Sequence, residues 1–207
     1  MMSGLFTSNE EERQLVLATG NPAKVTELND LLKGSGIRVR SLTEVAGPCE
    51  IEETGRTLEE NAEIKARFVF DKTGLPALAD DTGLEVDALD GMPGVYSARY
   101  GGPETDSARN RKKLLTSLKH LPSAQDRKAR FRTVLAYIDT HGLRRFEGIC
   151  NGVILTEERG DGGFGYDPLF MPEGYDLSFA EMDPSEKNRI SHRGRALQKF
   201  LQEISDR

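Results

Sequence analysis

The sequence contains no tryptophan, only two cysteines and only three histidines. Cys49 and Cys150 are too few for a disulfide framework or a cysteine metal cluster, so we expect ordinary thiols and a reducing, cytoplasmic setting. No apolar run approaches about 20 residues, so no segment is expected to span a membrane. Acidic residues outnumber basic ones by 34 to 28, which argues against a protein that coats nucleic acid but leaves room for a small anionic ligand.

Internal repeats and low-complexity segments are also missing from the sequence. A chain of 207 residues can bury a core as one domain or as two closely joined lobes. Residues 1–14 are polar and lack the apolar centre of a signal peptide, so we expect a frayed extension there. The remaining residues, 15–207, are expected to form a single two-lobed domain.

The most informative stretch is residues 78–84, Leu-Ala-Asp-Asp-Thr-Gly-Leu. An apolar run leads into Asp80 and Asp81, and an alternating strand pattern follows them. Two carboxylates ~4 Å apart repel each other by roughly 4 kcal/mol at an effective dielectric constant of 20. A divalent cation such as Mg²⁺ would relieve that repulsion at the end of a buried strand. A turn is the alternative, because Asp-Asp-Thr-Gly suits turn chemistry.

A second informative stretch begins with a short apolar strand over residues 15–18. A polar turn follows at residues 19–21, and Pro22 opens a helix that Gly34 ends. Free backbone N–H groups at the start of that helix, together with Lys24, predict an anion site. A plain strand–helix connection with a surface lysine is the alternative. Residues 37–40 are expected to form another strand.

The next helix is predicted to start at a capping box, Thr57 to Glu60, and to end at Gly74. Its apolar face consists of Leu58, Ala62, Ala66 and Val69. Asn61 and Lys65 lie four residues apart on one face, and most such pairs are solvated. Glu52 and Glu53 precede this helix, and we expect them to form a dense acidic cluster with Asp80 and Asp81.

The second half of the chain alternates between helices and strands. We expect a helix over 106–119, then a hairpin of two long strands, 129–140 and 143–156, with His141 exposed in its turn. A further helix starts at Asp183, and Ser191 is expected to cap the last helix.

Two segments of this half suggest a ligand. Phe164 lies among the glycines of residues 160–168, where a purine could stack on it at ~1–3 kcal/mol. A flexible hairpin loop is the alternative. His192 and Arg193 occupy the first turn of the last helix, where cations oppose the helix dipole. This placement indicates a compensating ligand, and two exposed basic residues beside a capping serine are the alternative.

Seven ordered motifs resemble those of the inosine triphosphate pyrophosphatase family, which includes bacterial dITP/XTP pyrophosphatases. The resemblance covers Leu15 to about Leu201. Thr82 stands where serine is common, which keeps a hydroxyl group. The motifs are Thr19–Lys24, Glu52–Gly55, Asn61 with Lys65, Ala79–Leu84, Pro93–Tyr100, Gly162–Pro168 and Ser191–Gly194.

The resemblance implies an α/β fold in which a long mixed sheet, flanked by helices, joins two lobes with a substrate cleft between them. It also implies a homodimer and a Mg²⁺-dependent enzyme, with Mn²⁺ as a possible substitute. The expected reaction converts nucleoside triphosphates with deaminated purines (dITP, ITP, XTP, dXTP) to the monophosphate and pyrophosphate. Rival interpretations are a pyrophosphatase of modified pyrimidine nucleotides and a non-catalytic nucleotide sensor.

The resemblance also implies roles for individual residues. Glu53 and Asp81 match the metal ligands, and Asp81 matches the proton acceptor, with Asp80 as our second candidate for that role. Thr82 is expected to touch the substrate. The remaining expected binding residues are, for the triphosphate, Thr19, Gly20, Asn21, Pro22, Ala23 and Lys24, and, for the base side of the pocket, Phe164, Gly165, Tyr166, Asp167, Lys187, His192 and Arg193.

Overall fold

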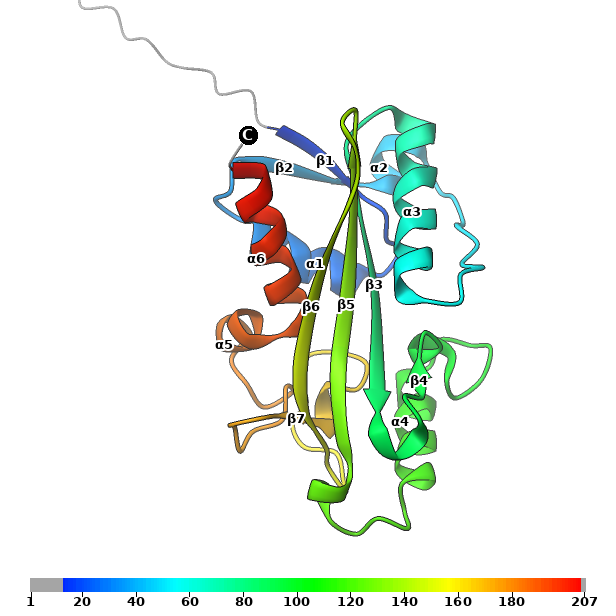
Figure 1. Cartoon of the computed structure of the whole chain (residues 1–207), viewed down its shortest axis with the longest axis vertical. Coiled ribbons are helices and arrows are strands. Elements are labelled where there is room, and N and C mark those ends of the chain that lie inside the picture. Colours follow the sequence, from blue (N-terminus) through cyan, green and yellow to red (C-terminus); the bar gives the residue numbers. More distant parts are fainter. Residues whose placement is uncertain (1–12, 206–207) are drawn as a thin grey trace, which may run out of the picture.

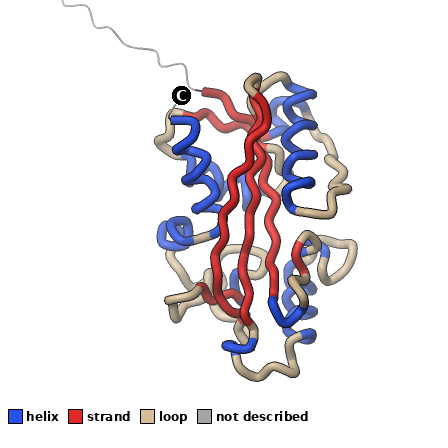
Figure 2. Tube along the Cα trace, viewed as in Figure 1, coloured by secondary structure: helices blue, strands red, loops and turns tan. Residues whose placement is uncertain are grey.

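The computed structural model describes residues 13–205, which form one seven-stranded sheet with helices on both faces (Figures 1 and 2). The strand order is β2-β1-β3-β5-β6-β7, and β4 pairs with β3. β1 runs parallel to β2 and β3, whereas the other pairs are antiparallel, so the predicted mixed sheet is confirmed. The strands are β1 (Arg13–Leu17), β2 (Ile37–Ser41), β3 (Ala77–Val86), β4 (Pro93–Gly94), β5 (Lys128–Asp139), β6 (Gly142–Ile154) and β7 (Phe170–Pro172).

Helices cover the two faces at one end of the long strands (Figure 1). Leu28 of α1 and Phe200 of α6 share an apolar cluster with Leu78 and Leu135 on one face. The opposite face packs against α3, mainly through small side chains such as Ala62 and Ala66. The helices are α1 (Pro22–Leu32), α2 (Leu42–Ala46), α3 (Leu58–Thr73), α4 (Ser107–Ser117), α5 (Pro184–Ile190) and α6 (His192–Ser205).

A separate apolar cluster forms at the other end of β3, β5 and β6. It combines Leu84 and Phe131 of the strands with Leu114 of α4 and Phe170 of β7. Four single-turn 3-10 helices connect the elements, η1 (Asp87–Leu89), η2 (Ser97–Arg99), η3 (Ala124–Asp126) and η4 (Asp167–Leu169). No helix within residues 13–205 combines the length and apolar character needed to cross a membrane.

The helix ends follow their local sequence signals. The Thr57 side chain accepts a hydrogen bond from the backbone N–H of Glu60, and Gly74 ends α3 in the left-handed conformation. Only half of the predicted capping box forms, because the Glu60 carboxylate accepts from the N–H of Arg56 instead of Thr57. The predicted hairpin is confirmed, since β5 pairs with β6 from Lys128 to Asp139 and His141 is exposed in its turn.

Two predictions about strand boundaries are wrong. Asp80 and Asp81 lie in the middle of β3, neither at its end nor in a turn, because β3 pairs with β5 without interruption from Ala77 to Val86. Arg13 and Gln14, assigned to the polar extension, belong to β1. The remainder of that extension, residues 1–12, lies outside the described residues.

Close contact between α6 and β6 depends on Gly148. A Cβ atom at this position would overlap the carbonyl oxygen of His192 and approach the backbone nitrogen of Ala196. The backbone of α6 therefore lies directly against the strand, where only glycine leaves enough room.

We expect Gly148→Ala to lower the free energy of unfolding by about 1–3 kcal/mol, because the added methyl group forces α6 away from the sheet. Denaturant titration followed by circular dichroism measures this loss. Gly20→Ala is the matched control, since its Cβ would meet no atom within 4 Å, and it should change stability by less than about 0.5 kcal/mol. Equal stability of the two variants would contradict the packing argument.

Candidate active site

Asp80 and Asp81 point to opposite faces of the sheet because successive side chains of a strand alternate. Asp80 faces α1 and α6, where it forms ion pairs with Lys24 and with Arg193, whose Nε lies 2.9 Å from Oδ2. Asp81 faces α3, where its Oδ1 lies 2.6 Å from Lys65 Nζ. The prediction of one dense cluster of four acids is therefore wrong.

The Asp80 carboxylate is fully buried and fully committed to its partners. Burial alone would raise its pKa, but the adjacent Arg193 and Lys24 outweigh burial and hold the pKa well below its usual range. The same contacts raise the pKa of the Arg193 guanidinium. Asp80 is therefore a permanent anion that joins α1 and α6 to β3.

Asp81 has a different environment. Burial raises its pKa above the ordinary value, against the opposing effect of Lys65. Lys65 Nζ lies 3.0 Å from Glu53 Oε1 and donates a hydrogen bond of 2.8 Å to the carbonyl oxygen of Asp80. Burial lowers the pKa of Lys65, but Asp81 and Glu53 outweigh this effect and raise it, so the ammonium group stays charged. Two carboxylates thus share one lysine.

These groups line a cavity of about 340 Å³, here called the acidic cavity. Its carboxylates are Glu50, Glu53 and Asp81, and its cations are Lys24, Lys65 and Arg99. Three of the predicted triphosphate residues, Thr19, Gly20 and Asn21, also line it.

A second cavity, of about 130 Å³, adjoins the first and is here called the aromatic cavity. Asn21, Lys24, Thr82, Ala98 and Thr105 line both, so the two cavities meet at this point. The rings of the aromatic cavity come from Phe131, Phe164, Tyr166 and His192, and its charged residues are Lys24, Asp167, Lys187 and Arg193.

Arg193 lines the aromatic cavity and is almost completely buried. Its Nη1 donates to Glu27 at 2.5 Å, and its Nη2 donates to the Thr82 hydroxyl at 3.2 Å. Thr82 Oγ1 lies 2.6 Å from Thr133 Oγ1 on β5. The alternative that His192 and Arg193 are exposed basic residues is wrong, since both are buried against the sheet.

The glycine-rich loop is held in place by Asp167. Asp167 Oδ2 accepts hydrogen bonds from the Phe164 N–H at 2.7 Å and from Lys187 Nζ at 2.8 Å. Gly163 has a positive φ of 67°, and a Cβ there would overlap the same carboxylate. Lys187 Nζ also lies 5.3 Å from the centroid of the Phe164 ring.

Two contacts anchor this loop to the α4 side of the fold. The Tyr166 hydroxyl donates to the carbonyl oxygen of Ser97 at 2.9 Å, and Arg111 Nη1 donates to the carbonyl oxygen of Gly165 at 2.9 Å. Ser97 in turn binds the N–H of Leu84 on β3. The loop therefore has a defined position relative to the sheet.

His192 lines the aromatic cavity and carries a buried polar atom without a partner. Its ring stacks on Phe131 with centroids 4.6 Å apart, and its Nδ1 is buried without a hydrogen-bond partner. Burial, together with Arg193 and Lys187, lowers the pKa of His192 well below its ordinary value. The ring is therefore neutral near pH 7 and can exchange a hydrogen bond with a ligand.

A few predicted residues lie outside both cavities. Pro22 and Ala23 form the first turn of α1 and line neither cavity. The Asn21 side chain accepts from the N–H groups of Ala23 and Lys24, so these groups are not free as predicted. Asp80 and Glu52 also line neither cavity.

The sequence reasoning missed other cavity residues. Lys65 and Asn61 are buried, contrary to the expectation of a solvated pair. The helical period could have shown this for Lys65, because it lies three residues after Ala62 and four before Val69, on the apolar face. Arg99 and Asn110 also went unassigned; Arg99 lies within the motif Pro93–Tyr100, whereas no local pattern marked Asn110.

A divalent metal would find a suitable but incomplete set of ligands here. Glu53 and Asp81 offer carboxylate oxygens on one wall of the acidic cavity, which fits the preference of Mg²⁺. Within residues 13–205, no three His, Cys, Asp or Glu side chains converge as a ready-made metal site. The remaining ligands would have to be substrate or water oxygens.

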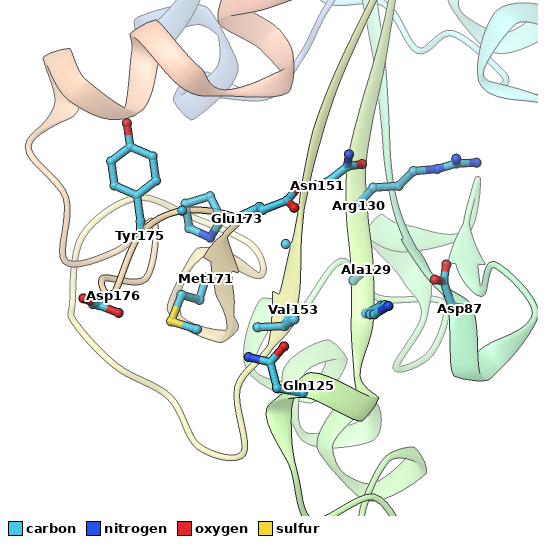
Figure 3. Close-up of a pocket in the computed structure, with 14 residues that line it drawn as sticks. Asp87, Gln125, Ala129, Arg130, Asn151, Val153, Met171, Glu173, Tyr175 and Asp176 are labelled. Carbon is cyan, nitrogen blue, oxygen red and sulfur yellow. The ribbon is translucent and has the colours of Figure 1, made fainter.

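A larger cavity, of about 590 Å³, lies elsewhere (Figure 3). Its walls come from β5, β6 and the segment after β7, with Asn151, Met171 and Tyr175 among them. It contains no predicted site residue, and none of the unpartnered buried polar side chains in the described chain lines it. The two smaller cavities are therefore the stronger candidate.

We expect His192 to make stability depend on pH. Its pKa is lowered in the folded state, so the unfolded chain binds an additional proton below about pH 6.5 and the free energy of unfolding falls on acidification. Between pH 7.5 and 5.5, wild type should lose about 1.4 kcal/mol more than His192→Asn. Urea titrations at both pH values measure the difference.

His141→Asn is the control, because this side chain is 73% exposed in the hairpin turn. It should keep the pH dependence of wild type. If His192→Asn kept it as well, the neutral state assigned to the His192 ring would be wrong.

Comparison with known proteins identifies relatives of this chain. A model of the Ham1 family matches residues 15–203. A dITP/XTP pyrophosphatase of Porphyromonas gingivalis is 52% identical over 184 residues, which cover 89% of this chain and 93% of the relative. A dITP/XTP pyrophosphatase of Desulforamulus reducens is 52% identical over 190 residues, covering 91% and 94% of the two chains.

Solved structures show the same fold. A HAM1 protein from Coxiella burnetii superposes with a TM-score of 0.85 and 41% identity, covering 94% of this chain and all of the other. The Ham1 protein of Staphylococcus aureus gives a TM-score of 0.83 and 33% identity, with 94% and 99% covered. These findings confirm the resemblance indicated by the sequence motifs, and the chain belongs to the Ham1 family.

Proposed function

We propose that this chain hydrolyses nucleoside triphosphates with deaminated purine bases, ITP, XTP and their deoxy forms, to the monophosphate and pyrophosphate. One observation carries the proposal: an acidic cavity with three cations opens into an aromatic cavity, and Lys24 and Thr82 line both. A nucleoside triphosphate likewise consists of a charged triphosphate and an aromatic base. The activity named for the relatives from P. gingivalis and D. reducens agrees with this arrangement.

Asp81 is the better candidate for the proton acceptor. A general base works best when its pKa approaches the working pH, and burial moves the pKa of Asp81 in that direction. The pKa of Asp80 is held low by Lys24 and Arg193, and its carboxylate does not reach the acidic cavity. Asp81 would accept the proton of the attacking water, while Lys65 holds the carboxylate in place.

The phosphates would occupy the acidic cavity. Lys24 lies where the two cavities meet, so its ammonium group can bind the phosphate nearest the sugar. Glu53 and Asp81 would hold Mg²⁺ or Mn²⁺, which would neutralise phosphate charge and polarise the phosphoryl group. The fixed charges on this chain would align the triphosphate with Asp81.

The base would occupy the aromatic cavity. Phe164 offers a ring face for stacking, and the unpartnered His192 Nδ1 is available for a hydrogen bond. Hypoxanthine and xanthine carry an acceptor oxygen at C6, where adenine carries an amino donor. A cavity that donates to this oxygen would leave a buried donor unpaired against adenine, which can reject a substrate ~10⁴-fold.

The assembly and compartment follow from the family resemblance. We expect a homodimer, which light scattering would detect as a particle of twice the 22.9 kDa chain mass. We expect the enzyme to work in the cytoplasm, where it would remove deaminated purines from the nucleotide pool.

Substitution of the two buried acids should affect different properties: Asp81 should affect activity, and Asp80 should affect stability. Asp81→Asn should lower kcat by at least ~10²-fold while the fold stays stable, because it removes the proton acceptor and a metal ligand. Asp80→Asn should lower the free energy of unfolding by about 3–5 kcal/mol, because it breaks a buried ion pair with two cations. Steady-state kinetics and denaturant titration test both variants. If Asp81→Asn kept full activity while Asp80→Asn were stable but inactive, Asp80 would be the proton acceptor instead of Asp81.

A substrate panel tests the function itself. With Mg²⁺, kcat/KM should be highest for ITP, XTP and their deoxy forms, lower for GTP, and lowest for ATP and pyrimidine nucleotides. Pyrophosphate and monophosphate should appear in equal amounts, and EDTA should stop the reaction.

Each rival function predicts a different result from this panel. Binding of ITP without any product would indicate a sensor, and fastest cleavage of a modified pyrimidine would indicate the other enzyme. Cleavage of ATP as fast as ITP would refute base selection, and full turnover in EDTA would refute the metal assignment.

A further inference from the structure

Arg99 belongs to the motif Pro93–Tyr100, which the roles assigned above do not use. It ends η2 and lies on the wall of the acidic cavity. Its backbone is fixed on both sides, since its N–H donates to the carbonyl oxygen of Tyr96 at 3.0 Å and its own carbonyl accepts from Gly102 at 3.1 Å. The guanidinium carbon lies 5.3 Å from the centroid of the Tyr96 ring, a cation–π contact that orients the side chain.

Arg99 differs from the other cations of the two cavities. Lys24 pairs with Asp80, Lys65 with Glu53 and Asp81, Lys187 with Asp167, and Arg193 with Asp80 and Glu27. Among residues 13–205, Arg99 is the one lysine or arginine of these cavities for which no carboxylate partner is found. Its charge is therefore available to an anionic ligand.

The position of Arg99 indicates which part of a ligand it would meet. It lines the acidic cavity but not the aromatic cavity, whereas Lys24 lines both. Arg99 belongs to η2 and Lys65 to α3, so these two cations of the acidic cavity come from different elements. A triphosphate whose base fills the aromatic cavity would extend its outer phosphates into the acidic cavity, whose wall includes Arg99.

We propose that Arg99 binds the two outer phosphates of the substrate, the group released as pyrophosphate. The proposal rests on the function proposed above and adds a residue to it. A guanidinium group matches two phosphate oxygens with two parallel N–H donors, and contact with Tyr96 reduces the freedom lost on binding.

Binding of the two products separates this role from a general structural one. Pyrophosphate carries only the outer phosphates, and IMP carries only the base, the sugar and the inner phosphate. Isothermal titration calorimetry with each compound, in buffer containing Mg²⁺, should show that Arg99→Ala weakens pyrophosphate binding about 10- to 100-fold. IMP binding should change less than about twofold. Arg99→Lys should recover part of the lost affinity, because it restores the charge without the fork of donors.

Arg109→Ala is the matched control, since this arginine of α4 is 61% exposed, pairs with Glu104 and lines neither cavity. It should bind both compounds as wild type does. The role of Arg99 would be refuted if Arg99→Ala weakened the binding of pyrophosphate and of IMP equally, or if it left the pyrophosphate affinity unchanged. It would also be refuted if wild type bound no pyrophosphate. Wild type that binds pyrophosphate but releases none from any nucleoside triphosphate would instead refute the proposed function.

Discussion

The structure depends on two adjacent carboxylates buried in the middle of one strand. A buried charge is costly unless a partner compensates it, so each carboxylate requires a cation from a neighbouring element. Strand alternation sends Asp80 to Lys24 and Arg193 on one face and Asp81 to Lys65 on the other. The same two residues therefore determine how α1, α6 and α3 are placed around β3.

This arrangement also gives two chemically identical side chains different roles, one structural and one at the cavity. The Asp80 side chain lines neither cavity and stabilises the packing of α1 and α6 on β3. The Asp81 side chain lines the acidic cavity, and its pKa is raised. Asp167 has a similar structural role, because its carboxylate accepts hydrogen bonds from Lys187 and from the backbone N–H of Phe164.

Local sequence signals predicted much of the fold but little of the burial. Pro22, Thr57 and Gly74 mark helix ends through backbone chemistry that depends only on near neighbours, and the hairpin turn at residues 141–142 does the same. The position of Asp80 and Asp81 inside β3 depends on pairing with β5, about 50 residues later in the sequence. The burial of His192 and Arg193 likewise arises from distant partners, which no local pattern encodes, whereas the helical period already places Lys65 on the apolar face of α3. Motif order identified many of the cavity residues but could not separate Asn21, which lines both cavities, from Ala23, which lines neither.

The long strands have a mechanical consequence. β5 and β6 are hydrogen-bonded without a break from Lys128 and Val153 to Asp139 and Gly142, and they contribute to the apolar clusters at both ends of the molecule. The two ends are thus connected by a continuous ribbon and not by a flexible linker. Movement of α3 and α4, which pack at opposite ends of this ribbon (Figure 1), toward each other would twist or bend it, and the elastic energy of such a deformation grows smoothly with its amplitude. We therefore expect the two halves to approach each other by continuous bending of β5 and β6, without a discrete hinge.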